Sequence, residues 1–247
     1  MAERSRQEIQ QAKTRAGAYI DEGLRAYMLG VYNYMASGVL LTGFISLIAS
    51  NTPAIFNALY TTTPQGQLGY TTLGIVVAFS PLAIYFMTFF RINKIKTSTA
   101  HMAFWAYASL MGLSISYIFH LYTGLSIATV FFMAAATFGG LSLWGYTTKK
   151  DISGWGSFLF MGILGFFIVS LATWVFDLTA FYFWISVIGL LLFSGFTAYF
   201  TQQVKKMYYA QDSRDVASKK AIFGAFFLYL SFMMIFMYML RIFGGKD

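Results

Sequence analysis

The 247-residue sequence contains no cysteine and only three prolines, and charged residues make up 11% of it. Without cysteine, the chain forms no disulfide and offers no thiolate to a metal ion. Ordinary globular domains carry about 25% charged residues and roughly 45–50% apolar ones. Here the hydrophobic share is 58%, so there are too few polar side chains to cover a surface in water. The composition therefore excludes an ordinary soluble domain and indicates an integral membrane protein.

Motifs that would indicate an enzyme are also missing. There is no phosphate-binding GxxxxGK[ST], no zinc-binding HExxH and no G-x-S-x-G around a nucleophilic serine. His101 and His120 have no carboxylate or histidine partner within their own predicted helix. A charge at mid-bilayer usually marks an ion or proton path, and the centres of the apolar runs hold none. We therefore expect no enzyme, no cofactor, no metal site and no carboxylate-based pump.

What the sequence does contain is seven apolar runs, each long enough to cross about 30 Å of hydrocarbon as a helix. They span residues 27–50, 70–90, 102–120, 125–146, 156–176, 179–200 and 221–243. The runs predict an all-α integral membrane protein with a seven-helix transmembrane domain over residues 27–247. The polar tail of residues 1–26 precedes it. This tail lies on the membrane surface, docks on a cytoplasmic partner or is disordered. It has no apolar core, which excludes a signal peptide, and its acidic residues exclude a transit peptide.

Basic residues give these helices an orientation. Fifteen of the 17 lysines and arginines fall in the tail and in segments 91–101, 147–155 and 201–220. The intervening loops, 51–69, 121–124 and 177–178, carry none. Cytoplasmic loops collect Lys and Arg, so we predict a cytoplasmic N-terminus and a C-terminus on the opposite side. The same rule accounts for the net charge of +8, and we expect no nucleic-acid partner.

Small and hydroxyl residues recur at helical spacing in the third to fifth runs, for example Ser114 and Ser142. They favour close helix packing, and the alternative is the polar lining of a cavity. Pro81 is expected to kink the second run, because it cannot donate the helical hydrogen bond.

The segment 138–165, FGGLSLWGYTTKKDISGWGSFLFMGILG, resembles the Bax inhibitor-1 family, in particular its bacterial YccA-like members. Three further stretches agree: FFRINK around Arg91, GLSISYIF from Gly112 and SVIGLLLFSGFTAYFTQQVKKMY from Ser186. The resemblance extends from about residue 25 to 245. It implies two three-helix layers around a central seventh helix, in the inner membrane of a bacterial cell.

In the ion-leak members of this family, two aspartates near the pore mouth share a proton, and an arginine here matched by Arg91 competes for them. The resemblance places these aspartates after Tyr199 and after Leu230, where this sequence has Phe200 and Ser231. Neither Phe nor Ser supplies a proton site or a carboxylate ligand for Ca²⁺. We therefore predict that the two-aspartate ion site is lost.

The resemblance implies two activities, a Ca²⁺ or proton leak and association with the membrane-bound FtsH protease. Without the aspartates, we expect a non-enzymatic interaction or modulator protein that binds another membrane protein or complex, such as FtsH. The alternative is a pH-sensitive Ca²⁺ or proton leak through a pore without carboxylates. Candidate pore or interaction residues are Arg91, His120 and Arg241.

Overall fold

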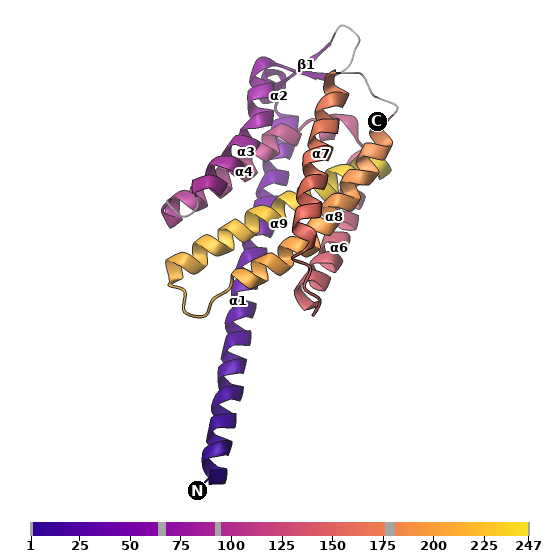
Figure 1. Ribbon diagram of the computed structural model, residues 1–247. Helices are drawn as coiled ribbons and strands as arrows, with labels where there is room; N and C mark the ends of the chain where they lie inside the picture. Colours follow the sequence, from indigo (N-terminus) through magenta and orange to yellow (C-terminus); the bar gives the residue numbers. More distant parts are fainter. Residues whose placement is uncertain (1, 64–67, 92–94, 176–180, 247) are drawn as a thin grey trace.

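The computed structural model describes residues 2–63, 68–91, 95–175 and 181–246; for 2–21, 89 and 170–175 it describes the backbone alone. The predicted junction at 177–178 lies outside these residues. Within them the chain forms nine α-helices and one two-stranded sheet (Figure 1). In chain order these are α1 (Ala2–Asn51), α2 (Pro53–Leu59), β1 (Tyr60–Thr62), β2 (Leu68–Tyr70), α3 (Thr72–Arg91), α4 (Thr97–Ile115), α5 (Ile118–Leu121), α6 (Gly124–Thr147), α7 (Trp155–Val175), α8 (Tyr182–Met207) and α9 (Arg214–Phe243).

Five helical segments in the described residues are long and apolar enough to cross a membrane. They are Glu22–Asn51 of α1, Thr97–Leu121 of α4 and α5, and the whole of α6, α8 and α9. The helices α3 and α7 are apolar too, over Thr72–Thr88 and Trp155–Val169. The prediction of a helical membrane protein is confirmed, with one short two-stranded sheet that it did not include.

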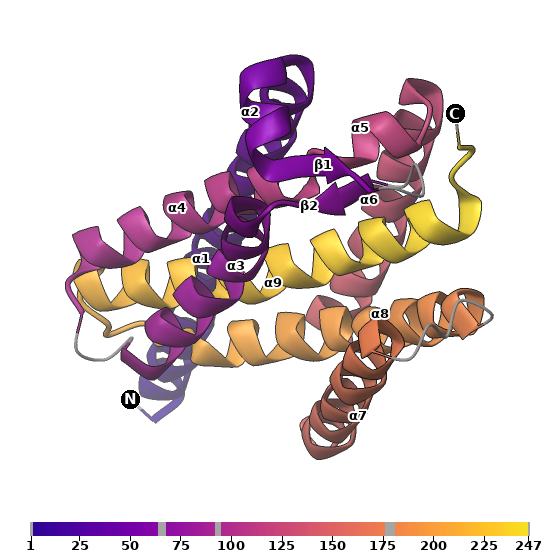
Figure 2. The same cartoon turned by 90° about the horizontal axis from the view of Figure 1, so that it is seen from above.

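The last helix, α9, is the most enclosed element of the bundle. Buried residues make up 78% of its apolar window, against 17–44% in the other four membrane-length segments. It packs against α1, α4, α6 and α8, whereas α7 packs on α8, and α3 on α4 and the α2–β2 segment (Figure 2). A helix that is apolar on all sides needs such surroundings, and α9 has Phe, Leu, Met and Tyr around its whole circumference.

The first helix is longer than the first apolar run predicts. The chain is helical without a break from Ala2 to Asn51, a length of about 75 Å at 1.5 Å per residue. Figure 1 shows its N-terminal part extending away from the bundle, with the two chain termini at opposite ends. The polar tail and the first apolar run are therefore one continuous element.

Two serine hydroxyls replace the helical hydrogen bond that Pro81 cannot make, one from its own helix and one from α4. Proline has no N–H to donate to the carbonyl four residues earlier, which is that of Val77. Ser80 Oγ donates to this carbonyl at 2.7 Å, and Ser114 Oγ of α4 lies 3.0 Å from it. The hydroxyl of Ser114 thus serves helix packing, as one reading of the third run predicted.

The third apolar run was expected to be one helix, but it is interrupted. The α4 helix ends at Ile115, a turn follows, and α5 resumes at Ile118. Such a break frees backbone carbonyls that must be satisfied at membrane depth. Tyr60 OH of β1 lies 3.0 Å from the carbonyls of both Leu113 and Ser114, so the β1–β2 hairpin supplies the missing donor.

Candidate functional site

Phe200 and Ser231, the two positions that the resemblance assigns to aspartates, both contact Phe227. Phe200 of α8 stacks on the Phe227 ring, with centroids 4.2 Å apart and planes 16° apart. Ser231 lies one helical turn after Phe227 in α9, and its Oγ donates to the Phe227 carbonyl at 3.0 Å. The serine side chain is 2% exposed. Each position therefore contacts Phe227, Phe200 through its ring and Ser231 through an intrahelical hydrogen bond to the backbone.

Further aromatic rings surround Phe227. Phe223 meets it edge-on at 4.7 Å, and Tyr85 of α3 does so at 6.1 Å. Phe196 lies 4.9 Å from Phe200 on the α8 side. Edge-to-face and stacked pairs of this kind contribute about 0.5–1.5 kcal/mol each beyond their buried area. We call Tyr85, Phe196, Phe200, Phe223 and Phe227 the aromatic cluster; it is an apolar contact between α3, α8 and α9.

The other candidate residues do not join this cluster into one path. Arg91 ends α3, is exposed, and makes no ion pair with any residue that the structure describes. His120 stacks on Phe56 at 3.9 Å beyond the far end of α4, a helix about 28 Å long. Arg241 lies over the Tyr238 ring at 5.8 Å, in the last turn of α9.

A buried hydroxyl contact holds α1 against α4 and α9. Thr42 Oγ1 and Tyr229 OH are 2.6 Å apart, and both side chains are at most 1% exposed. The same threonine oxygen lies 2.9 Å from the Gly38 carbonyl and 2.8 Å from the Ala108 carbonyl of α4. A threonine about one turn from the middle of the apolar run 27–50 looks like any packing residue, so the sequence did not predict this contact.

A second hydroxyl contact joins α1 to α6 and α8. Tyr32 OH lies 2.6 Å from Ser142 Oγ, which lies 2.9 Å from Thr201 Oγ1. Thr201 in turn donates to the Thr197 carbonyl of its own helix at 2.8 Å. The hydroxyls of the third and fourth runs that we describe, Ser114 and Ser142, thus bond to neighbouring helices.

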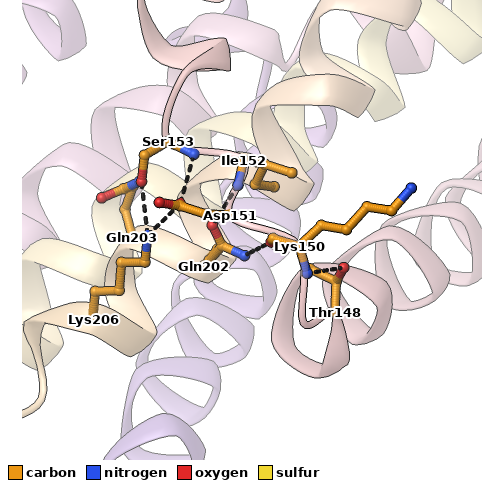
Figure 3. Close-up of polar contacts among 8 residues, drawn as sticks. All are labelled: Thr148, Lys150, Asp151, Ile152, Ser153, Gln202, Gln203 and Lys206. Atoms are coloured by element: carbon orange, nitrogen blue, oxygen red, sulfur yellow. Dashed lines mark hydrogen bonds and ion pairs between the residues drawn. The ribbon is translucent and has the colours of Figure 1, made fainter.

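The loop between α6 and α7 is clamped to the end of α8 by a buried glutamine (Figure 3). Gln202 Oε1 accepts from the Ile152 amide at 3.0 Å, and its Nε2 donates to the Lys150 carbonyl at 2.8 Å. Gln202 is 5% exposed. One side chain therefore satisfies two backbone groups of the loop, as a neighbouring strand would.

A solvent-exposed ion pair joins the same loop to α8 (Figure 3). Lys206 Nζ lies 2.6 Å from Asp151 Oδ1 and donates to Ser153 Oγ at 2.7 Å. Lys206, followed by the hydrogen bonds from Ser153, lowers the pKa of Asp151 from 3.8 to about 2. A lowered carboxyl pKa means that the pair is complete above about pH 4 and is lost as the pH falls through about 2. Two of the stretches that carry the family resemblance, 138–165 and 186–208, thus meet in one loop contact.

Long apolar helices around a buried central helix define a multi-pass α-helical membrane protein. A family model described as inhibitor of apoptosis-promoting Bax1 matches residues 24–247. The chain therefore belongs to the Bax inhibitor-1 family, as the resemblance predicted.

Relatives agree with this assignment over nearly their whole lengths. A Caulobacter vibrioides protein is 41% identical over 94% of this chain and 93% of its own. A Rickettsia prowazekii protein is 39% identical over 92% of each chain. The inner membrane protein YbhL of Escherichia coli K12 is 38% identical over 91% of this chain and 93% of its own. The predicted location, the bacterial inner membrane, is confirmed; the YccA-like assignment within the family stays a prediction.

Proposed function

We propose that this protein is a non-enzymatic interaction or modulator protein of the inner membrane in which the two-aspartate ion leak is lost. The observation that carries the proposal is the contact of Phe200 and Ser231 with Phe227. A Ca²⁺ ion takes six to eight oxygen ligands, commonly including carboxylates. The five rings of the aromatic cluster carry a single oxygen, the Tyr85 hydroxyl, and neither Phe200 nor Ser231 supplies a carboxylate.

All seven long helices cross the membrane in this proposal, with the N-terminus inside. At 20 and 21 residues, α3 and α7 have the length of about 30 Å that a span requires. The helices α1, α3 and α4 then form one layer and α6, α7 and α8 the other, with α9 between them. The distribution of basic residues supports the orientation, because it follows the positive-inside rule.

The proposed partner is a membrane complex, with the FtsH protease as the first candidate from the family resemblance. Residues 2–21 are the N-terminal part of α1, which extends beyond the bundle (Figure 1). This polar segment is held away from the other helices, which supports a docking role for it. Lys149 and Lys150 are also exposed, in the loop between α6 and α7, outside this helical segment.

Flux measurements test the ion part of the proposal. Wild-type protein in vesicles loaded with Ca²⁺- and pH-sensitive dyes is expected to give the flux of protein-free vesicles, at neutral and at acidic pH. The Phe200→Asp/Ser231→Asp double variant restores two neighbouring carboxylates that share a proton, so a pH-dependent flux is expected to appear. Phe200→Asn/Ser231→Asn is the uncharged control. Wild-type flux well above the protein-free level would overturn the loss of the leak.

Co-purification tests the partner separately. Tagged full-length chain, extracted in a mild detergent, is expected to retain FtsH at a fixed stoichiometry. Deletion of residues 2–21 is expected to release it, since these residues extend the docking helix, whereas Lys149→Ala/Lys150→Ala leaves that helix intact and serves as the control. Recovery of the free chain alone from wild-type membranes would count against FtsH as the partner, whatever the flux experiment shows.

A further inference from the structure

A cavity of about 300 Å³ lies beside the central helix, between α1 and α6. Its floor is formed by Phe232, Met233 and Phe236 of α9, which are 2–4% exposed. Its mouth lies between Gly43 of α1 and Phe132 of α6, and Phe132 is 70% exposed. The mouth therefore opens sideways, between two helices that face the hydrocarbon of the membrane.

One polar atom in this cavity has no partner. Ser46 lines the cavity, is 1% exposed, and its Oγ makes no hydrogen bond. Thr42, one turn earlier on the same wall, has its hydroxyl engaged by Tyr229 OH and by two backbone carbonyls. The great majority of buried hydroxyls in proteins are hydrogen-bonded, because an unmade bond costs free energy. A free hydroxyl in a cavity that is otherwise apolar indicates a ligand with one polar group.

The depth of Ser46 indicates which ligand this is. Five residues separate it from the end of α1 at Asn51, so it lies about 7.5 Å along the helix axis from that end. The apolar segment Glu22–Asn51 has 30 residues and is about 45 Å long, so about 30 Å of hydrocarbon centred on it ends about 7.5 Å from Asn51. The ester carbonyls of phospholipids lie at this edge, and an ester carbonyl is an acceptor for a serine hydroxyl. Below Ser46 the cavity is lined by aliphatic and aromatic side chains, which suit an acyl chain.

We propose that the cavity binds one acyl chain of a phospholipid, taken from the leaflet at the C-terminal end of α1, with Ser46 Oγ donating to its ester carbonyl. The chain enters between Gly43 and Phe132 and lies along Phe232, Met233 and Phe236. Nearer the other membrane surface, the hydrogen bond between Tyr32 and Ser142 holds the same two helices together, so the opening is confined to this leaflet. This site does not depend on the proposed function.

Photolabelling tests the site on the full-length chain. The protein is reconstituted in vesicles of phosphatidylethanolamine and phosphatidylglycerol that contain a phospholipid with a diazirine in its acyl chain, and adducts are mapped by mass spectrometry. Phe232, Met233 and Phe236 of α9 are expected to be labelled, although each is at most 4% exposed. Leu191 of α8, 67% exposed, reports labelling by bulk lipid. Labelling of Leu191 without labelling of α9 would overturn the proposal.

Variants separate the site from general lipid contact. A Cβ at Gly43 meets no atom within 4 Å, so a side chain can be introduced there, and Gly43→Phe is chosen to block the mouth. It is expected to lower the α9 adducts at least tenfold while Leu191 adducts stay constant. Gly139→Phe on α6, equally open but outside the cavity, is the control and leaves both unchanged. Ser46→Ala is expected to lower α9 labelling about fivefold, the weight of one hydrogen bond. Unchanged α9 labelling in Gly43→Phe would also overturn the site.

Discussion

At the scale of single residues, the two partners of the Thr42–Tyr229 hydrogen bond are expected to differ in how much stability is lost when each is replaced. In Tyr229→Phe, Thr42 keeps the Gly38 and Ala108 carbonyls, so one hydrogen bond is lost, about 0.6 kcal/mol between membrane helices. In Thr42→Val, the buried Tyr229 hydroxyl loses the partner that Thr42 provides, and we expect a loss of about 1–3 kcal/mol. Thermal unfolding in detergent is expected to show the larger decrease for Thr42→Val. Equal decreases would mean that Tyr229 finds another acceptor.

At the scale of elements, hydropathy predicted the long helices well, because lipid demands long apolar runs whatever their neighbours are. It missed α2, the β1–β2 hairpin and the break between α4 and α5, because these depend on one tertiary contact. Tyr60 reaches carbonyls more than fifty positions away in the chain, and no local pattern encodes such a partner. The helical continuation of α1 through the polar tail was likewise missed, since polar residues give a hydropathy profile no signal.

The candidate site was predicted only in part, because the tertiary partners of its residues are not encoded by local sequence patterns. The family resemblance selected Phe200 and Ser231, and the structure places both on Phe227, which the sequence did not single out. Arg91 was selected by the resemblance and His120 by its polarity, and the two lie beyond opposite ends of α4. Gln202 was part of a quoted motif, but its role in clamping the α6–α7 loop required knowledge of which loop packs against α8.

At the scale of the whole molecule, reporter fusions test whether all seven long helices cross the membrane. Green fluorescent protein fused after residue 96, 150 or 210 is expected to fluoresce, because an N-inside chain with seven spans returns each of these loops to the cytoplasm. Alkaline phosphatase is expected to be active after residue 123 and at the C-terminus. A surface-lying α3 would move position 96 outside, and a surface-lying α7 alone would move position 210 outside. The C-terminal fusion is outside with either five or seven spans, so the internal fusions decide the count.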